Sequence, residues 1–263
     1  MSLSGKPSIL KLELTNRCNA NCVFCNREQM KREPQDMALP DALRIIHECD
    51  FVDEVQPQLW GEPTLYPDLK NVVEYAMRHG KRVVFYTNGT GSLLGVVPTK
   101  VIFSMDAATP ETFKRVRPGI SFWLAYRHIK AYWEAHSSEV EIVVRATACA
   151  ENRSELGRLK EFWSPLCHRV VIEEEHPMFR DSAKRGPLIE DFSCRYVDTD
   201  LVVMSSGRLA LCCVDYEGEF GGGDATNGVM AAWNSDVISH NRKLVKAGKW
   251  LSLCENCAFR HRR

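Results

Sequence analysis

The sequence predicts an α/β fold: a partial (β/α)6 TIM-like barrel followed by a small C-terminal domain. β-rich runs alternate with helical patterns along the first two thirds of the chain, which predicts βαβ units and a parallel sheet. Six such units within about 175 residues indicate an open or partial barrel rather than a closed one. The alternation stops near residue 178, so the domains are expected at 1–177 and 178–263.

The barrel elements are short and are separated by polar loops. Strands are predicted at 9–14, 54–60, 82–86, 100–104, 140–147 and 169–173. Helices are predicted at 41–49, 67–79, 121–136 and 154–163. Pro40 opens the first helix and Gly80 stops the second. Three glycines and a proline separate the third and fourth strands, so the helix there is expected to be abbreviated.

The C-terminal part has a different pattern. Residues 178–191 carry arginine, proline and glycine and are expected to be a linker. Residues 197–205 and 208–212 predict a hairpin around Ser206 and Gly207. Residues 230–247 carry a helical pattern, and the chain then ends in a CxxC and a basic tail.

Composition excludes several classes of function. The 263 residues are 44% hydrophobic and carry 34 basic and 34 acidic side chains. Polyanion-binding proteins usually have a basic excess, so no nucleic-acid partner is expected. The N-terminus lacks a signal-peptide pattern and no run of 18 apolar residues occurs, so no membrane partner is expected. Eleven cysteines without a secretory signal favour metal ligands over disulfides, and a reducing cytoplasm is expected.

Three cysteines follow the first predicted strand in a CxxxCxxC pattern: Cys18, Cys22 and Cys25. A loop with this spacing can present three thiolates to one 4Fe–4S cluster, which leaves one iron without a protein ligand. A catalytic metal site needs such an open position, whereas a structural site is closed. The alternative is a zinc site completed by a fourth ligand from elsewhere in the chain.

With these cysteines the sequence resembles the radical S-adenosylmethionine (SAM) superfamily, in which three such cysteines hold the cluster that binds SAM. Phe24 fits the aromatic position that members set against the adenine. Segments after the second, third and fourth strands resemble the GGEP, TNG and SxDG motifs of the family, with Trp60 replacing the first glycine of GGEP. The resemblance implies SAM-binding roles for Trp60, Gly61, Glu62, Thr87, Asn88, Ser104 and Asp106.

Other positions stay open at this stage. Arg117 lies in a segment that resembles the RxG stretch of the family, and Arg145 near the end of the fifth strand is a candidate for the SAM carboxylate. The alternative for Arg145 is an ordinary ion pair. The alternatives for the SAM-binding positions are a solvated carboxylate at Glu62, a turn at Asn88, and helix caps at Ser104 and Asp106.

A second group of cysteines lies in the C-terminal third. The order of its members resembles that of Twitch, a shortened SPASM domain that holds one auxiliary 4Fe–4S cluster. The ligands implied by the resemblance are Cys194, Cys212, Cys254 and Cys257. Cys212 is favoured over Cys213 because it has the family's spacing from Gly207. Four thiolates close the coordination shell and favour electron transfer, and a structural zinc site is the alternative. The remaining three, Cys49, Cys149 and Cys167, are expected to be core residues.

The resemblance implies that SAM is cleaved to a 5′-deoxyadenosyl radical that abstracts a hydrogen atom from a small-molecule substrate. The leading hypothesis is a two-electron oxidation with the auxiliary cluster as electron acceptor, as in the 2-deoxy-scyllo-inosamine dehydrogenases, which the architecture resembles. A flavodoxin or ferredoxin is the family's expected electron donor. Oxidation also needs a proton acceptor, for which the acidic segment after the sixth strand offers Glu174 and His176. The alternative interpretation of this segment is a solvated acidic run.

The same residues are compatible with three other functions. A radical epimerase needs a hydrogen-atom donor, for which Cys213 is the candidate. A maturase of ribosomally made peptides often carries a separate peptide-recognition domain, and only eight residues precede the first strand. A zinc- or iron-binding protein without catalysis is the non-enzyme alternative.

Overall fold

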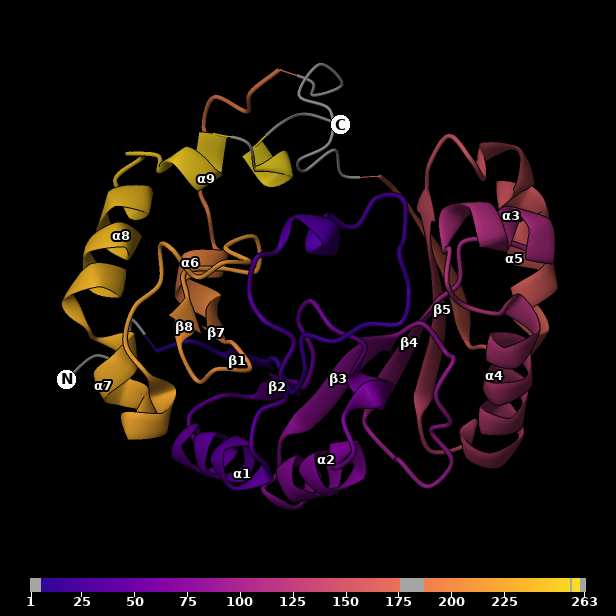
Figure 1. The fold of residues 1–263 in the computed structure, drawn as a ribbon, viewed down its shortest axis with the longest axis horizontal. Helices are drawn as coiled ribbons and strands as arrows, with labels where there is room; N and C mark the ends of the chain where they lie inside the picture. Colours follow the sequence, from indigo (N-terminus) through magenta and orange to yellow (C-terminus); the bar gives the residue numbers. More distant parts are fainter. Residues whose placement is uncertain (1–5, 176–186, 256, 261–263) are drawn as a thin grey trace.

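An eight-stranded sheet organises the protein in a computed structural model, which describes residues 6–175, 187–255 and 257–260. The strand order is β6-β5-β4-β3-β2-β1-β7-β8, and β1 to β6 are parallel. The sheet curves without closing, which confirms the predicted partial barrel (Figure 1). Its first six strands are β1 (Ile9–Leu12), β2 (Glu54–Gln56), β3 (Arg82–Thr87), β4 (Lys100–Ser104), β5 (Glu141–Ala148) and β6 (Arg169–Glu174).

Helices cover the outer side of this arc, and the long loop after β1 lies inside it (Figure 1). The barrel helices are α1 (Leu39–Glu48), α2 (Leu69–Arg78), α3 (Pro110–Val116), α4 (Phe122–His136) and α5 (Leu156–Trp163). The sequence did not predict α3, which begins with Pro110 and is capped by the Thr109 side chain. Residues 88–99, between β3 and β4, contain no helix, in line with their glycine content.

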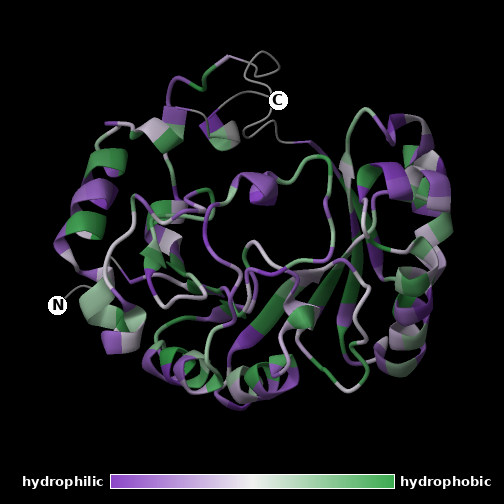
Figure 2. Ribbon diagram, viewed as in Figure 1, coloured by the Kyte–Doolittle hydropathy of each residue, from purple (hydrophilic) through white to green (hydrophobic). Residues whose placement is uncertain are grey.

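Strand alternation separates the core from the interior of the arc. In β1, Leu10 and Leu12 are fully buried in the core cluster that includes residues of α1 and α2, whereas Lys11 lies on the opposite face. Figure 2 shows helices that alternate between hydrophobic and hydrophilic residues around largely hydrophobic strands. The inner face of the sheet is therefore free to carry polar side chains.

The C-terminal hairpin extends the same sheet. Strand β7 (Asp200–Val203) pairs in parallel with β1 and antiparallel with β8 (Leu209–Ala210). Gly207 makes the turn between them with a φ of 85°, which favours glycine. The predicted strand at 197–205 was wrong at its start, because residues Tyr196–Thr199 form helix α6.

The predicted helix at 230–247 is two helices, α7 (Val229–Trp233) and α8 (Asp236–Lys246). Asn234 and Ser235 interrupt it, and such short polar residues favour helix ends over helix interiors. Helix α9 (Ser252–Glu255) precedes the last described turn. Six short 3₁₀ helices complete the described structure: Asn26–Gln29, Pro63–Leu65, Arg153–Glu155, Ser164–Leu166, Ala225–Asn227 and Ala258–Arg260.

A buried charged network joins the loop after β1 to the hairpin. The carboxylate of Glu13 is fully buried and accepts hydrogen bonds from Arg32 Nη1 at 2.7 Å and from the Ser205 amide at 2.9 Å. Arg32 also donates through Nε to the Tyr216 carbonyl at 2.6 Å. These bonds fix the hairpin against the loop that carries the first cysteine group.

The predicted domain boundary at residue 177 lies outside the described residues. Within the part of the chain that the structure describes, none of the helices has the length and apolar character needed to cross a membrane.

Candidate active site

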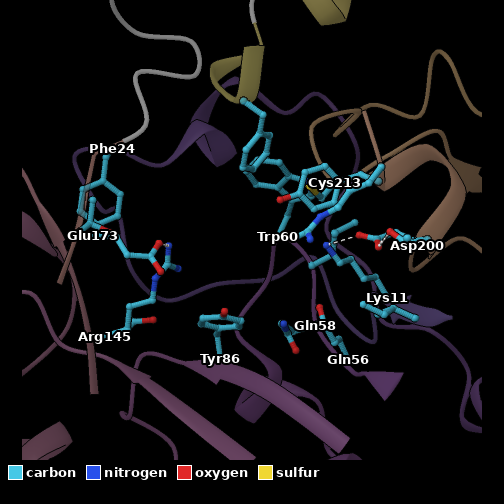
Figure 3. Close-up of a pocket in the computed structure, with 18 of the residues that line it drawn as sticks. Lys11, Phe24, Gln56, Gln58, Trp60, Tyr86, Arg145, Glu173, Asp200 and Cys213 are labelled. Carbon is cyan, nitrogen blue, oxygen red and sulfur yellow. Dashed lines mark hydrogen bonds and ion pairs between the residues drawn. The ribbon is translucent and has the colours of Figure 1, made fainter. Parts of the chain in front are cut away.

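A cavity of about 930 Å³ lies on the inner face of the sheet. Seven neighbouring strands each contribute to its lining, with Lys11, Gln56, Tyr86, Ser104, Arg145, Glu173 and Asp200 from β1 to β7 in order. Segments of the C-terminal part complete the lining with Arg195, Tyr196, Cys213 and Phe259. The barrel and the C-terminal part therefore share one cavity (Figure 3).

The three cysteines of the first group lie on a loop that is docked on the barrel. The backbone amides of Asn21 and Val23 donate to the carbonyls of Pro118 and Val116 at 2.8 and 3.0 Å. Burial raises the pKa of the Cys18 thiol, and raises that of Cys22 to about 11. Bound iron would stabilise these cysteines as thiolates.

Arg117 is the cationic neighbour of this loop. Its Nη1 donates to Cys22 Sγ at 3.2 Å, and its guanidinium lies 5.6 Å from the centre of the Phe24 ring. Its Nε pairs with the buried carboxylate of Asp106. A fixed positive charge beside Cys22 suits a site that gathers several thiolates, so the residues present fit an iron–sulfur cluster.

Glu62 ties the two predicted SAM-binding segments, after β2 and after β3, to each other. Its buried carboxylate accepts hydrogen bonds from the Thr87 hydroxyl at 2.6 Å and the Asn88 amide at 2.7 Å. Thr64 donates to it as well, from its hydroxyl at 2.7 Å. Burial raises the pKa of Glu62, and these hydrogen bonds oppose the rise. Glu62 is thus a buried link between two strand ends, not a solvated carboxylate.

Gly61 and Asn88 lie against the loop of the first cysteine group. A Cβ added at Gly61 would lie 2.1 Å from the Thr15 carbonyl oxygen, so only glycine fits there. Asn88 donates from Nδ2 to Asn19 Oδ1 at 2.8 Å, and its own Oδ1 accepts from the Thr90 amide at 2.9 Å. The side chain of Asn88 therefore both forms a turn and holds the cysteine loop.

The remaining predicted SAM-binding residues lie at the cavity. Trp60, Phe24 and Ser104 line it directly, and so does Asp106, which also accepts a hydrogen bond from the Thr147 amide at 2.6 Å. Neither Ser104 nor Asp106 caps helix α3. Arg145 forms an ion pair with Glu173 and lies 5.4 Å from the centre of the Tyr86 ring.

The two glutamates at the end of β6 face opposite ways. Glu173 lines the cavity beside Arg145, whereas Glu174 pairs with Arg153 at 2.7 Å, where both side chains are more than half exposed. The structure therefore does not bring the predicted proton acceptor Glu174 to the cavity and places its neighbour Glu173 there. His176 lies outside the described residues.

Several C-terminal cysteines are electrostatic neighbours of one another. The pKa of Cys257 is raised to about 11, first by burial and then by the nearby Cys194, Cys254 and Cys213. Burial raises the pKa of the Cys212 thiol, and the nearby Cys213 and Cys257 contribute to the rise. Cys213 also lines the cavity. Cysteines that are far apart in the sequence are thus electrostatic neighbours. Among the described residues no three metal-ligating side chains are grouped closely enough to hold a metal ion, so the shared cluster stays a prediction.

Sequence reasoning missed most of the cavity wall. Lys11, Gln56 and Asp200 each line it, and Lys11 Nζ lies 2.7 Å from Asp200 Oδ2. The alternation of leucines in residues 9–14 does place Lys11 opposite the core. The partnership with Asp200 depends on the pairing of β1 with β7, for which the local sequence gives no signal.

Comparison with known families decides the class of the protein. Residues 12–157, more than half of the chain, match the model of the radical SAM superfamily, so the chain belongs to that superfamily. Residues 194–258 match the model of an iron–sulfur cluster-binding domain, SPASM. The protein is therefore a radical SAM enzyme that uses SAM and 4Fe–4S chemistry, with further iron–sulfur binding in its C-terminal part. Iron–sulfur clusters, not zinc, are the cofactors expected at both cysteine groups.

Curated relatives resemble part of the chain. The mycofactocin maturase MftC of Mycobacterium ulcerans is 32% identical over 164 residues, which cover 59% of this chain and 43% of that protein. The tungsten-containing aldehyde ferredoxin oxidoreductase cofactor-modifying protein of Pyrococcus furiosus is 26% identical over 167 residues, 58% of this chain and 47% of the relative. The match thus spans less than half the length of either relative.

Solved structures share the fold over nearly the whole chain. BtrN in complex with AdoMet and 2-DOIA has a TM-score of 0.61 at 18% identity, with 97% of this chain and 94% of that chain covered. SuiB of Streptococcus suis bound to the precursor peptide SuiA has a TM-score of 0.72 at 14% identity, with 97% and 70% covered. At these identities the likeness establishes the fold.

Proposed function

We propose that this radical SAM enzyme oxidises a hydroxyl-bearing small molecule by two electrons. The observation that carries the proposal is the shared cavity: Cys213, beside the predicted ligand Cys212, lines the same space as the predicted SAM-binding residues Phe24 and Ser104. An electron acceptor at the C-terminal cysteines would therefore lie next to the substrate.

The cysteine groups hold the two clusters in this proposal. Cys18, Cys22 and Cys25 ligate the cluster that binds SAM, and Cys194, Cys212, Cys254 and Cys257 ligate the auxiliary cluster. When bound, SAM and its cluster supply the 5′-deoxyadenosyl radical. A flavodoxin or ferredoxin is the electron donor that we propose.

The oxidation balances as follows. With SAM and both clusters bound, the carbinol carbon would lose a hydrogen atom to the radical, its hydroxyl would lose a proton to a carboxylate, and the auxiliary cluster would accept the remaining electron, which would leave a ketone. Glu173 is the carboxylate of the predicted acidic segment that reaches the cavity, and we assign it the proton. The lining by Tyr196 and Phe259 helps to exclude water from this reaction.

The size of the cavity supports a small substrate. Ligand pockets of about 300–1,000 Å³ enclose drug-sized molecules, and this cavity must hold SAM as well as the substrate. The likeness to BtrN with 2-DOIA over both whole chains also favours a small molecule. The match to a mycofactocin maturase favours a peptide substrate instead, so a peptide maturase is the second candidate.

The test is turnover by enzyme whose clusters have been reconstituted without oxygen and verified at about eight irons per chain. It is offered reduced flavodoxin as the electron donor and SAM, together with 2-deoxy-scyllo-inosamine, myo-inositol or a mycofactocin precursor peptide. A ketone lighter than its substrate by two hydrogens is the expected result. A modified peptide with unchanged small molecules would overturn the proposal in favour of a maturase, and solvent deuterium in a product of unchanged formula would favour the epimerase.

Neighbouring carboxylates provide a matched pair of variants. Glu173→Gln removes the carboxylate in the cavity and should lower ketone formation about 100-fold, a typical effect of losing a general base. Glu174→Gln removes the exposed carboxylate and should leave turnover unchanged. Equal activities for the two variants would remove Glu173 from the mechanism.

A further inference from the structure

Buried polar atoms without a hydrogen bond gather at the cavity. Among the described residues, four such atoms belong to cavity-lining side chains: Gln58 Oε1, Trp60 Nε1, Arg145 Nε and Asp200 Oδ2. Asp200 Oδ2 is the exception among the four, because Lys11 Nζ lies 2.7 Å from it as its charged partner. A buried polar group without a partner costs free energy, so such a group in a cavity indicates a ligand atom that completes it.

These atoms divide between two walls of the cavity. Figure 3 shows Arg145 and Glu173 on the side of Phe24, the predicted adenine contact, and Lys11 with Asp200 across the cavity. Gln58 lies on the floor between the walls. Among the residues labelled in Figure 3, Trp60 is the one member of the predicted SAM-binding segments on the side of Lys11 and Asp200. This wall is therefore available to the substrate.

Lys11 and Asp200 form a nearly buried ion pair on this wall. Their side chains are 16% and 2% exposed. Burial alone would lower the pKa of Lys11, but Cys213 and Asp200 outweigh it and raise that pKa. Thr199 donates its hydroxyl to Asp200 Oδ1 at 2.7 Å, so Oδ2 is the oxygen directed to Lys11. The pair thus offers a charged donor and a charged acceptor side by side.

We propose that Lys11, Gln58, Trp60 and Asp200 form the subsite for a small molecule with hydroxyl groups on adjacent carbons, a polyol or an amino polyol. This assignment rests on the function proposed above and names its substrate class. Asp200 Oδ2 and Gln58 Oε1 are acceptors, whereas Lys11 Nζ and Trp60 Nε1 are donors. A hydroxyl group can donate one hydrogen bond and accept another. Two neighbouring hydroxyls can therefore donate to Asp200 Oδ2 and Gln58 Oε1 and accept from Lys11 Nζ and Trp60 Nε1.

Trp60 adds shape to this subsite. Its ring packs edge-on against Tyr216 at 5.7 Å between centroids, which fixes the indole at the cavity. The flat apolar ring offers a surface for the C–H face of a cyclic polyol, while its N–H meets an oxygen. In the motif that this segment resembles, the position holds glycine, so the side chain is an addition to the SAM-binding segment itself.

The test measures binding without turnover. Enzyme with both clusters and SAM, kept unreduced so that no radical forms, is titrated calorimetrically with 2-deoxy-scyllo-inosamine to about 10 mM, and with cyclohexylamine, which has the ring and amine but no hydroxyls. The polyol should bind with a Kd of about 1 mM or lower, and cyclohexylamine should bind at least tenfold more weakly.

Three variants examine the residues. Asp200→Asn and Lys11→Met should each weaken binding of 2-deoxy-scyllo-inosamine at least tenfold, and Trp60→Phe, which keeps a ring but loses the N–H, by about fivefold. Asp236→Asn, at an exposed aspartate of α8, is the matched control and should bind as the wild type does. The double variant Lys11→Met with Asp200→Asn removes the charged pair as a unit, so weak binding by a folded double variant separates loss of the subsite from loss of the fold.

Absence of binding by the wild type, or wild-type binding by both Asp200→Asn and Lys11→Met, would overturn the subsite. Its failure and that of the proposed function are distinguishable. If the Asp200→Asn and Lys11→Met variants bind as the wild type does and still form the ketone, the proposed oxidation is supported and the subsite is refuted. If the wild type and the variants bind as expected but no oxidised product forms, the subsite is supported and the proposed oxidation is refuted.

Discussion

Replacement of Arg117 by methionine isolates the buried charge beside the first cysteine group. The Arg117 side chain is 9% exposed and pairs with Asp106, which is 1% exposed. Methionine fills much of the same volume without charge or hydrogen-bond donors. The change removes the partner of Asp106 and the donor to Cys22 Sγ.

The expected loss of stability depends on which hydrogen-bond partners Asp106 keeps in each variant. In the variant its carboxylate retains the Thr147 amide at 2.6 Å and loses the guanidinium. Removing one partner of a buried ion pair costs about 3–5 kcal/mol, because the other charge stays buried alone. In the double variant with Asp106→Asn, the asparagine Oδ1 still accepts from Thr147 and no charge is left, so the loss falls to about 1–2 kcal/mol, the value of one or two hydrogen bonds. The double variant should therefore be more stable than Arg117→Met alone by about 2–3 kcal/mol.

Equilibrium urea unfolding of the iron-free protein, followed by tryptophan fluorescence, measures these differences. Trp163 is fully buried and reports on the barrel core. The control is Arg153→Met, which breaks a pair exposed to solvent and should leave the free energy of unfolding unchanged. A single variant as stable as the wild type, or a double variant no more stable than the single one, would refute the assignment of a buried charge pair.

Two further predictions concern the cysteine loop. Cys22→Ala should lower the iron content from about eight to about four atoms per chain and abolish SAM cleavage. Cys49→Ala, at a fully buried core cysteine, is the control and should keep the wild-type iron content and SAM cleavage. An unchanged iron content in Cys22→Ala would contradict the assignment of Cys22 as a cluster ligand. Gly61→Ala should lower the free energy of unfolding by about 3 kcal/mol, because its Cβ meets the Thr15 carbonyl at 2.1 Å. Gly157→Ala in helix α5 meets nothing within 4 Å and should stabilise by about 0.5–1 kcal/mol, so thermal unfolding of the two glycine variants should shift in opposite directions.

The sequence predicts the strands and the first cysteine loop well because both signals are local. In residues 9–14 leucines alternate with Lys11 and Glu13, which gives both the strand and its buried face. At β6 the same rule fails, since Val170, Val171 and Ile172 are apolar in succession. This strand lies at the edge of the sheet and both of its faces are partly exposed, so alternation does not tell which of Glu173 and Glu174 points inward.

The cavity wall that carries Lys11 and Asp200 is harder to predict from the sequence, because a long-range pairing of strands forms it. Asp200 reaches Lys11 only because β7 adds to the edge of the barrel at β1, about 190 residues away in the chain. No local periodicity encodes that contact. The same pairing brings Cys213 to the cavity, beyond the β8 strand of the hairpin. The C-terminal part therefore does more than add a cluster-binding domain: by extending the sheet it supplies one wall of the cavity and half of its buried ion pair, so that the proposed electron acceptor and the proposed substrate subsite are positioned by one hairpin.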